Sequence, residues 1–328
     1  MRFDSASREM RYFTRQGHRE IVPWFIMDLS RTALGGTMLL RSISTVKLVL
    51  VALMVSISGC STTEYMVKSM DPLMEEMNIS LNRNPDVDMV RDAFPANLIQ
   101  LDGFIQAAPN DKLLVRAAEG YFGYTFAFVE DNDKERARML YKKARDYALR
   151  VLLKDRYFRE SFDSGIEGFA KSLGEFTKED VPALYWAANT WMAWIALSLT
   201  DPEVLMDLPK VEAMLLRVVE LDESFYYGSA HATLGAFYAS RSKAIGGDPA
   251  KAKFHFDKAF ELSGSRLLFI HLLYAQYYAY QIQDRDLFVQ TLEKVIATPV
   301  GAFPEKNLAN EIAKRKAKAL LEDVDMYF

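Results

Sequence analysis

The chain has 328 residues, of which 50% are apolar, 26% are charged and one is cysteine. Eight of its 40 Lys and Arg and four of its 44 Asp and Glu precede residue 60, which leaves a net charge of −8 after that point. A mildly acidic surface argues against nucleic acid as a partner, since that binding favours a basic patch. A single cysteine excludes a C-x-x-C redox motif and a cysteine-ligated zinc site. We therefore expect no cofactor and no metal, and stability that comes from packing.

A secretory signal precedes that cysteine. Arg41 and Lys47 come before an uncharged apolar run, 48–55, and small residues then lead to Cys60. The run is short for a membrane span, which needs about 20 apolar residues. Ile57-Ser58-Gly59-Cys60 resembles the lipobox of bacterial lipoproteins, whose peptidase cuts before a cysteine that carries diacylglycerol. We predict lipidation of Cys60, and the alternative is a buried strand that ends in Gly-Cys.

The signal lies unusually deep in the chain. Met38 opens a stretch that is typical of a signal start, so we expect 38–59 to be the signal peptide. Residues 1–37 are then an extension from a misplaced start codon or a disordered leader. The mature protein would be residues 60–328. Ser61, rather than Asp, follows the cysteine, which favours the periplasmic face of the outer membrane.

Helical periodicity covers nearly all of the mature chain, and Pro and Gly cluster between the helical stretches. We therefore predict an all-α fold. Asp248-Pro249 is typical of a helix start, and Gly264 of a helix end. Pro304-Glu305 opens the last helix, which would cap the domain. The expected helices are 64–82, 88–107, 111–129, 133–153, 158–173, 181–199, 208–221, 225–244, 249–262, 266–283, 285–297 and 305–326.

One pair of these helices carries a repeat signature. It resembles the tetratricopeptide pattern W-x2-L-G-x2-Y followed by A-x3-F-x2-A, with histidine in place of tryptophan, and three weaker copies occur elsewhere. Small residues at such positions let two helices approach, and aromatic side chains fill the groove between hairpins. We predict a helical-hairpin repeat array, packed through His231, Leu234, Gly235, Tyr238, Ala252, Phe256 and Ala259.

No catalytic pattern is present in the sequence. The mature chain has three histidines, but no H-E-x-x-H pair and no G-x-S-x-G nucleophile motif. His231 and His255 are expected to have structural roles. Gly246-Gly247 lacks a phosphate-loop pattern and is expected to be a turn between helices. The sequence therefore predicts a protein that is not an enzyme.

An uncharged stretch, 182–200, contains three tryptophans. A helix that is apolar all round is buried in a large protein or spans a membrane. A core helix is the plainest interpretation, and one face could instead line an apolar cavity or a subunit contact. On a helix Trp186 and Trp194 share a stripe, and Trp191 lies on another side. We predict that Trp186, Trp194 and Tyr278 line a cavity, although packing between helices explains Tyr278 as well.

Taken together, the lipobox, the cryptic hairpins, the Gly246-Gly247-Asp248 turn and the ending "NLANEIAKRKAKALLEDVDMYF" are similar to the TatT family. This family is the tetratricopeptide-repeat-associated lipoprotein component of tripartite ATP-independent periplasmic (TRAP) transporters. The resemblance implies a membrane-anchored accessory protein that associates with a DctP-type solute-binding protein. It also implies homotrimers and a cavity for a small hydrophobic solute.

A protein-assembly scaffold at the outer membrane is the alternative, because repeat arrays bind peptides as readily as solutes. A peptide groove favours rows of polar Asn and Lys on the inner helices. The candidate inner helices here are rich in alanine and aromatic residues, which favours a closed apolar cavity.

Overall fold

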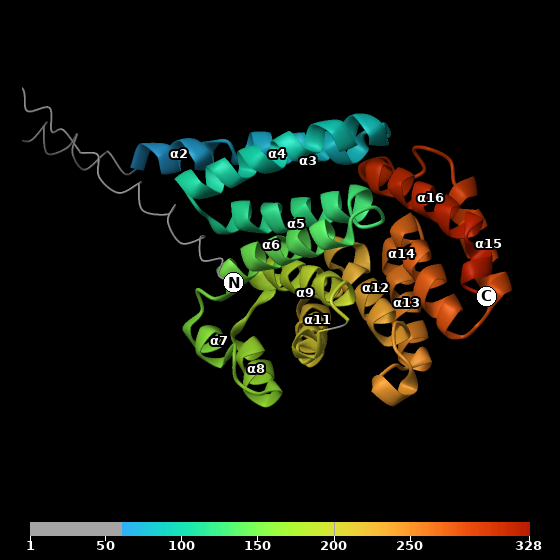
Figure 1. Ribbon diagram of the computed structural model, residues 1–328. Helices are drawn as coiled ribbons and strands as arrows, with labels where there is room; N and C mark the ends of the chain where they lie inside the picture. Colours follow the sequence, from blue (N-terminus) through green and yellow to red (C-terminus); the bar gives the residue numbers. More distant parts are fainter. Residues whose placement is uncertain (1–60, 200) are drawn as a thin grey trace, which may run out of the picture. The chain divides into compact units, whose positions relative to one another are not determined.

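The computed structural model describes residues 61–199 and 201–328, and every regular element in these ranges is helical. This confirms the predicted all-α fold (Figure 1). The helices are α2 (Ser61–Ser69), α3 (Asp71–Arg83), α4 (Val87–Ala107), α5 (Asp111–Phe128), α6 (Lys134–Leu152), α7 (Arg156–Ser161), α8 (Ile166–Ser172), α9 (Val181–Ala196), α10 (Pro202–Leu205), α11 (Leu208–Asp222), α12 (Phe225–Ala239), α13 (Pro249–Ser263), α14 (Leu268–Leu273), α15 (Arg285–Ala297) and α16 (Asn307–Glu322). A π-helical turn, η5 (Tyr274–Ala279), continues α14, and a 3-10 turn, η6 (Pro304–Lys306), precedes α16.

Local sequence signals explain where several helices begin and end. The Asp248 carboxylate accepts hydrogen bonds from the backbone N–H groups of Ala250 and Lys251, and Pro249 is the first residue of α13. Such a cap satisfies N–H groups that have no partner inside the helix. Gly264, with φ of 59°, ends the same helix in the left-handed region. The predicted start and end of this helix are confirmed.

Other boundaries differ from prediction. The single helix expected over 158–173 is two short helices, α7 and α8, because local bonds replace the helical ones at the break. There the Ser164 hydroxyl donates to the Ser161 carbonyl, and Gly165 adopts extended backbone. The helix expected over 225–244 ends at Ala239, and the short helix α10 was not predicted.

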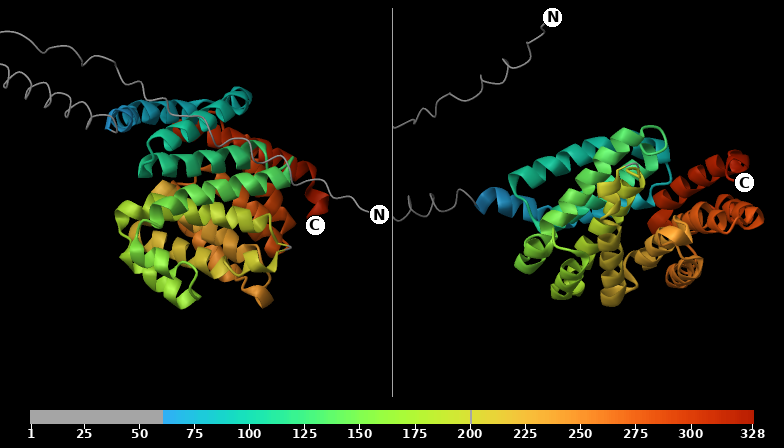
Figure 2. Two further views of the ribbon diagram at one scale, coloured as in Figure 1. Left: turned by 60° about the vertical axis from the view of Figure 1, so that its left-hand side comes forward. Right: turned by 60° about the horizontal axis from the view of Figure 1, so that its bottom comes forward.

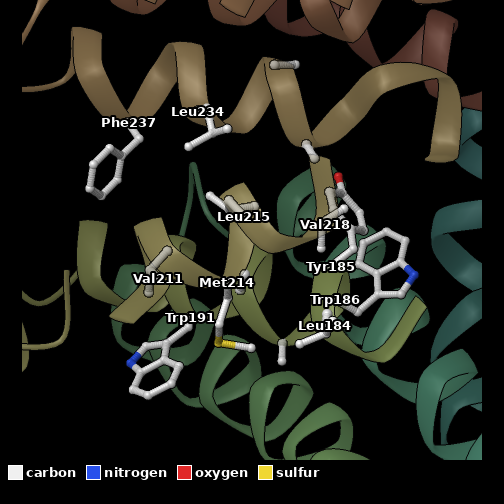
Figure 3. Close-up of a cluster of buried hydrophobic side chains, with 14 of the residues drawn as sticks. Leu184, Tyr185, Trp186, Trp191, Val211, Met214, Leu215, Val218, Leu234 and Phe237 are labelled. Carbon is white, nitrogen blue, oxygen red and sulfur yellow. The ribbon is translucent and has the colours of Figure 1, made fainter. Parts of the chain in front are cut away.

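Successive helices pack side by side through the middle of the chain. Close contacts join α5 to α6, α6 to α9, α9 to α11, α11 to α12 and α12 to α13, and Figures 1 and 2 show these helices following one another. The main core lies between α9, α11 and α12, where Leu184, Met214 and Leu234 are fully buried. Figure 3 shows this cluster, with Trp186 and Trp191 pointing to different sides of α9.

The hairpin of α12 and α13 contains the residues of the repeat signature. All seven are buried. A β-carbon added at Gly235 would lie 2.8 Å from Cδ2 of Phe256, so the absence of a side chain lets the two helices approach. The assignment of this hairpin to the tetratricopeptide class stays a prediction.

The array closes on itself, because its last helix packs against its first ones. The Arg315 guanidinium donates to both carboxylate oxygens of Asp88, at 2.8 and 2.9 Å. Beside this pair, Leu308 of α16 packs with Val87 and Val90 of α4 in a small apolar cluster. We call these contacts the end junction. In Figure 1, α16 reaches the end of α3 and α4.

Candidate functional site

The candidate site is a cavity of about 610 Å³ between α3, α4, α5 and α9 on one side and α12, η6 and α16 on the other. Its volume falls in the range of small-molecule sites, which is roughly 300–1,000 Å³. Most of the wall is apolar, as such sites usually are. Representative wall residues are Leu73 and Met77 of α3, Phe94 and Leu101 of α4, and Phe122 and Phe126 of α5.

Helix α3 shows why this space is a cavity and not core. Leu73 and Met77 line it, yet they are 58% and 51% exposed, and α3 has no buried residue. An exposed apolar side chain by itself needs no explanation, but a contiguous apolar lining does. Helix α3 thus covers the cavity without filling it.

Three polar side chains of the cavity wall meet where α5, α12 and η6 come together, and other polar residues of the wall lie on α3 and α4. The Tyr226 hydroxyl donates to Oε1 of Glu119 at 3.1 Å. Lys306 Nζ lies 4.1 Å from the centre of the Tyr226 ring and 5.6 Å from that of Tyr227. Cations are attracted to the face of aromatic rings at such distances. We call Glu119, Tyr226 and Lys306 the polar end of the cavity.

Burial shifts the titration of both charged groups at the polar end. It raises the pKa of Glu119 above its ordinary value, and the Lys306 ammonium opposes this shift. It lowers the pKa of Lys306, and the Glu119 carboxylate opposes that shift in turn. Both shifts have one cause, since a charge loses hydration when it is buried. Perturbed pKa values of this kind cluster at functional sites.

The backbone at the start of α12 is strained. Tyr226, Tyr227 and Gly228 have φ angles of 47°, 62° and 75°, in the left-handed region that non-glycine residues rarely adopt. A β-carbon at Gly228 would lie 2.8 Å from that of Leu262, so this position also needs glycine. Strain of this kind persists only where surrounding structure enforces it. Here it places the Tyr226 ring in the cavity wall.

Of the three tryptophans, Trp186 is among the lining residues of this cavity. Its ring lies 5.4 Å from that of Tyr226 and 5.6 Å from that of Phe122, centre to centre. Trp194 lies elsewhere, with the Arg145 guanidinium 4.5 Å from its ring centre. Trp191 is buried and stacks on Phe162.

Tyr278 stacks on Tyr274, with ring centres 4.9 Å apart, and packs near Phe256. Neither it nor Trp194 is a lining residue of the cavity. None of the three residues of the polar end was predicted from the sequence. Glu119 is the one acid between Arg116 and Glu130 of an otherwise apolar stretch, which is the signal that could have indicated it.

The histidines lie away from the cavity wall. The Nδ1 atoms of His231 and His255 are 2.8 Å apart, and one ring donates a hydrogen bond to the other. Burial lowers the pKa of His255 to about 4, and the neighbouring His231 adds to this shift. Cys60, the predicted lipidation site, lies outside the described residues, as do the predicted signal peptide and leader.

The described part of the chain contains no group of three or more His, Cys, Asp or Glu residues placed to hold a metal ion. None of its helices combines the length and the apolar character that crossing a bilayer requires.

The fold and the site define a class of protein, namely an all-α helical array whose last helix packs against its first ones and which holds a largely apolar cavity. Comparison with known proteins gives the family. The family model described as "TRAP transporter T-component" matches residues 83–328, and the chain belongs to this family. The resemblance to the TatT family is thereby confirmed. Membership supports an accessory role in a TRAP transport system and a membrane-associated, periplasmic location.

The chain is also similar to a protein of Treponema pallidum. This relative, an uncharacterized protein of the strain Nichols, is 24% identical over 260 residues, which cover 74% of this chain and 80% of the relative.

Proposed function

We propose that the protein is a lipid-anchored periplasmic component of a TRAP-type system that holds a small hydrophobic solute in its cavity and binds a DctP-type solute-binding protein. The observation that carries the solute part is the cavity of about 610 Å³ with its largely apolar wall. The family supports the transport context. Lipidation of Cys60 supplies the membrane anchor in this proposal, and a homotrimer stays the predicted assembly.

The closure of the array favours this proposal over a peptide-binding scaffold. An open array offers a concave groove along its inner helices. Here α16 packs against α3 and α4, and η6 against α3, so the last helices interrupt the groove that an open array would offer. An extended peptide needs an open groove or an exposed sheet edge. A small solute needs neither.

A pair of glycine substitutions tests the solute part. A side chain at Gly123 of α5 has open space around it, and Gly123 lines the cavity. Gly103 of α4 also has open space, but it is not a lining residue, which makes it the matched control. Isothermal titration calorimetry with decanol should show binding to the wild-type protein and to Gly103→Phe. Binding should be weak or absent in Gly123→Phe, because the new ring occupies the cavity. Wild-type protein that binds no decanol would contradict the proposal.

The partner part has its own test. The protein and a DctP-type protein from the same organism should elute together in size-exclusion chromatography. Separate elution at concentrations of tens of micromolar would contradict a stable complex.

A further inference from the structure

Lys306 is a buried cation that forms no ion pair with the residues that the structure describes. The residue is 9% exposed, and its side chain lines the cavity. Among the residues that the structure describes, no carboxylate oxygen lies within 4.0 Å of its Nζ atom, and this atom makes no hydrogen bond. An ammonium has three N–H donors, all of which water satisfies when the group is exposed. The Nζ atom is not among the fully buried polar atoms that lack a hydrogen-bond partner, so its donors are open to a molecule in the cavity.

Partly buried cations of α5 and α16 are paired. Lys314 and Lys316 of α16 have side chains that are 14% and 13% exposed, and each contacts a carboxylate, at 2.8 and 2.6 Å. Arg116, which also lines the cavity, contacts Asp71 at 3.0 Å and Glu75 at 2.9 Å. Lys306 therefore differs from its neighbours, and a structural ion pair does not explain it.

The surroundings of Lys306 leave its charge available to the cavity. The faces of Tyr226 and Tyr227 lie beside the ammonium and stabilise a cation without neutralising it. The nearest acidic group, Glu119, already accepts a hydrogen bond from the Tyr226 hydroxyl. The N–H groups of the Lys306 ammonium are therefore free to donate to a bound molecule. The polar end offers this positive charge to a largely apolar cavity.

We propose that Lys306 binds the carboxylate of a single-chain amphiphile, whose apolar tail lies between α3, α4 and α5. This inference rests on the proposed function and names the class of solute. One lysine matches one negative charge. Phosphate recognition commonly uses arginine pairs or several backbone N–H groups, and the one arginine of this cavity is held by Asp71 and Glu75.

Three ligands of equal chain length test the proposal, namely decanoate, decanol and decylamine, titrated into the purified protein by calorimetry at pH 7.5. A charge-assisted hydrogen bond contributes about 1.5–3 kcal/mol, so decanoate should bind the wild-type protein at least about tenfold more tightly than decanol. In Lys306→Met this preference should disappear while decanol binding persists. The exposed Lys318 of α16 is not a lining residue, so Lys318→Met serves as the control and should retain the preference.

Lys306→Met should fold, because methionine has a similar length and removes a buried charge. Equal affinities for decanoate and decanol in the wild-type protein would overturn the inference and leave the proposed function standing. A preference for decanoate over decanol that persists in Lys306→Met would have the same two consequences. Tightest binding of decylamine would assign recognition to Glu119 and also overturn it. If neither decanoate nor decanol binds, both the inference and the proposed function fail.

Discussion

Replacing Gly235 with alanine tests how α12 and α13 pack. The new β-carbon would lie 2.8 Å from Cδ2 and 2.9 Å from both Cγ and Cε2 of Phe256, distances that real β-carbons essentially never show. The Phe256 ring is fully buried, and Tyr274 packs edge-on against it, with ring centres 5.3 Å apart. The ring therefore has little freedom to move aside, and the two helices must separate instead.

Two effects of opposite sign determine how much the substitution changes the free energy of unfolding. Overpacking a buried contact costs about 1–3 kcal/mol. Alanine is a better helix former than glycine by about 1 kcal/mol, which offsets part of this cost. We expect a net loss of up to about 2 kcal/mol in the free energy of unfolding. With a urea slope of about 3 kcal/mol/M, the midpoint should fall by up to about 0.7 M.

Urea denaturation followed by circular dichroism measures this midpoint. Gly103→Ala is the matched control, because that glycine is exposed inside α4 and its added carbon meets nothing within 4 Å. It should raise stability by up to about 1 kcal/mol. If Gly235→Ala raises stability as much as Gly103→Ala does, the ring yields without cost, and the glycine does not set the distance between the helices.

Three more predictions follow from the structure and the sequence. Trp191→Ala should cost about 3–5 kcal/mol in chemical denaturation, more than Trp186→Ala at the cavity wall or Trp194→Ala, and equal losses would contradict the cavity assignment. The pKa of His255 falls from 6.5 to about 4 on folding. Between these pH values the unfolded chain therefore binds a proton that the folded protein does not bind. Stability that is complete above pH 6.5 should therefore fall as the pH approaches 4, and His255→Phe should weaken that dependence in urea titrations at pH 7 and 5. Mass spectrometry of the native protein should find a diacylglycerol-modified Cys60 at its N-terminus, and a mature chain that retains earlier residues would exclude this.

Local signals in the sequence predicted most of the helices. Asp248, Pro249 and Gly264 act on their own backbone within a few residues, so their effect does not depend on the rest of the fold. Periodicity also placed Trp186 and Trp191 on different sides of one helix, as Figure 3 shows.

The polar end of the cavity was not predictable in the same way. Glu119, Tyr226 and Lys306 come from three distant segments, and only the closure of the array brings them together. The left-handed backbone at Tyr226 and Tyr227 opposes the preference of both residues, so it depends on tertiary contacts.

Helical periodicity predicts on which side of a helix a residue lies, but not which other helix packs against that side. Trp186 and Trp194 share a stripe on α9, yet Arg145 of α6 packs against Trp194, whereas Trp186 faces Tyr226 and Phe122. Which tryptophan reaches a cavity is decided by the packing of other helices.

The end junction has a consequence for how the protein unfolds. In an open row of helical pairs each terminal pair has one neighbour, so the row loses structure from its ends. Here the first and last helices are neighbours of each other, and two residues of the junction, Val90 and Leu308, also line the cavity. A molecule bound there touches both ends of the array at once. Its binding energy would then oppose fraying from either end and couple occupancy of the cavity to the cooperativity of the whole domain.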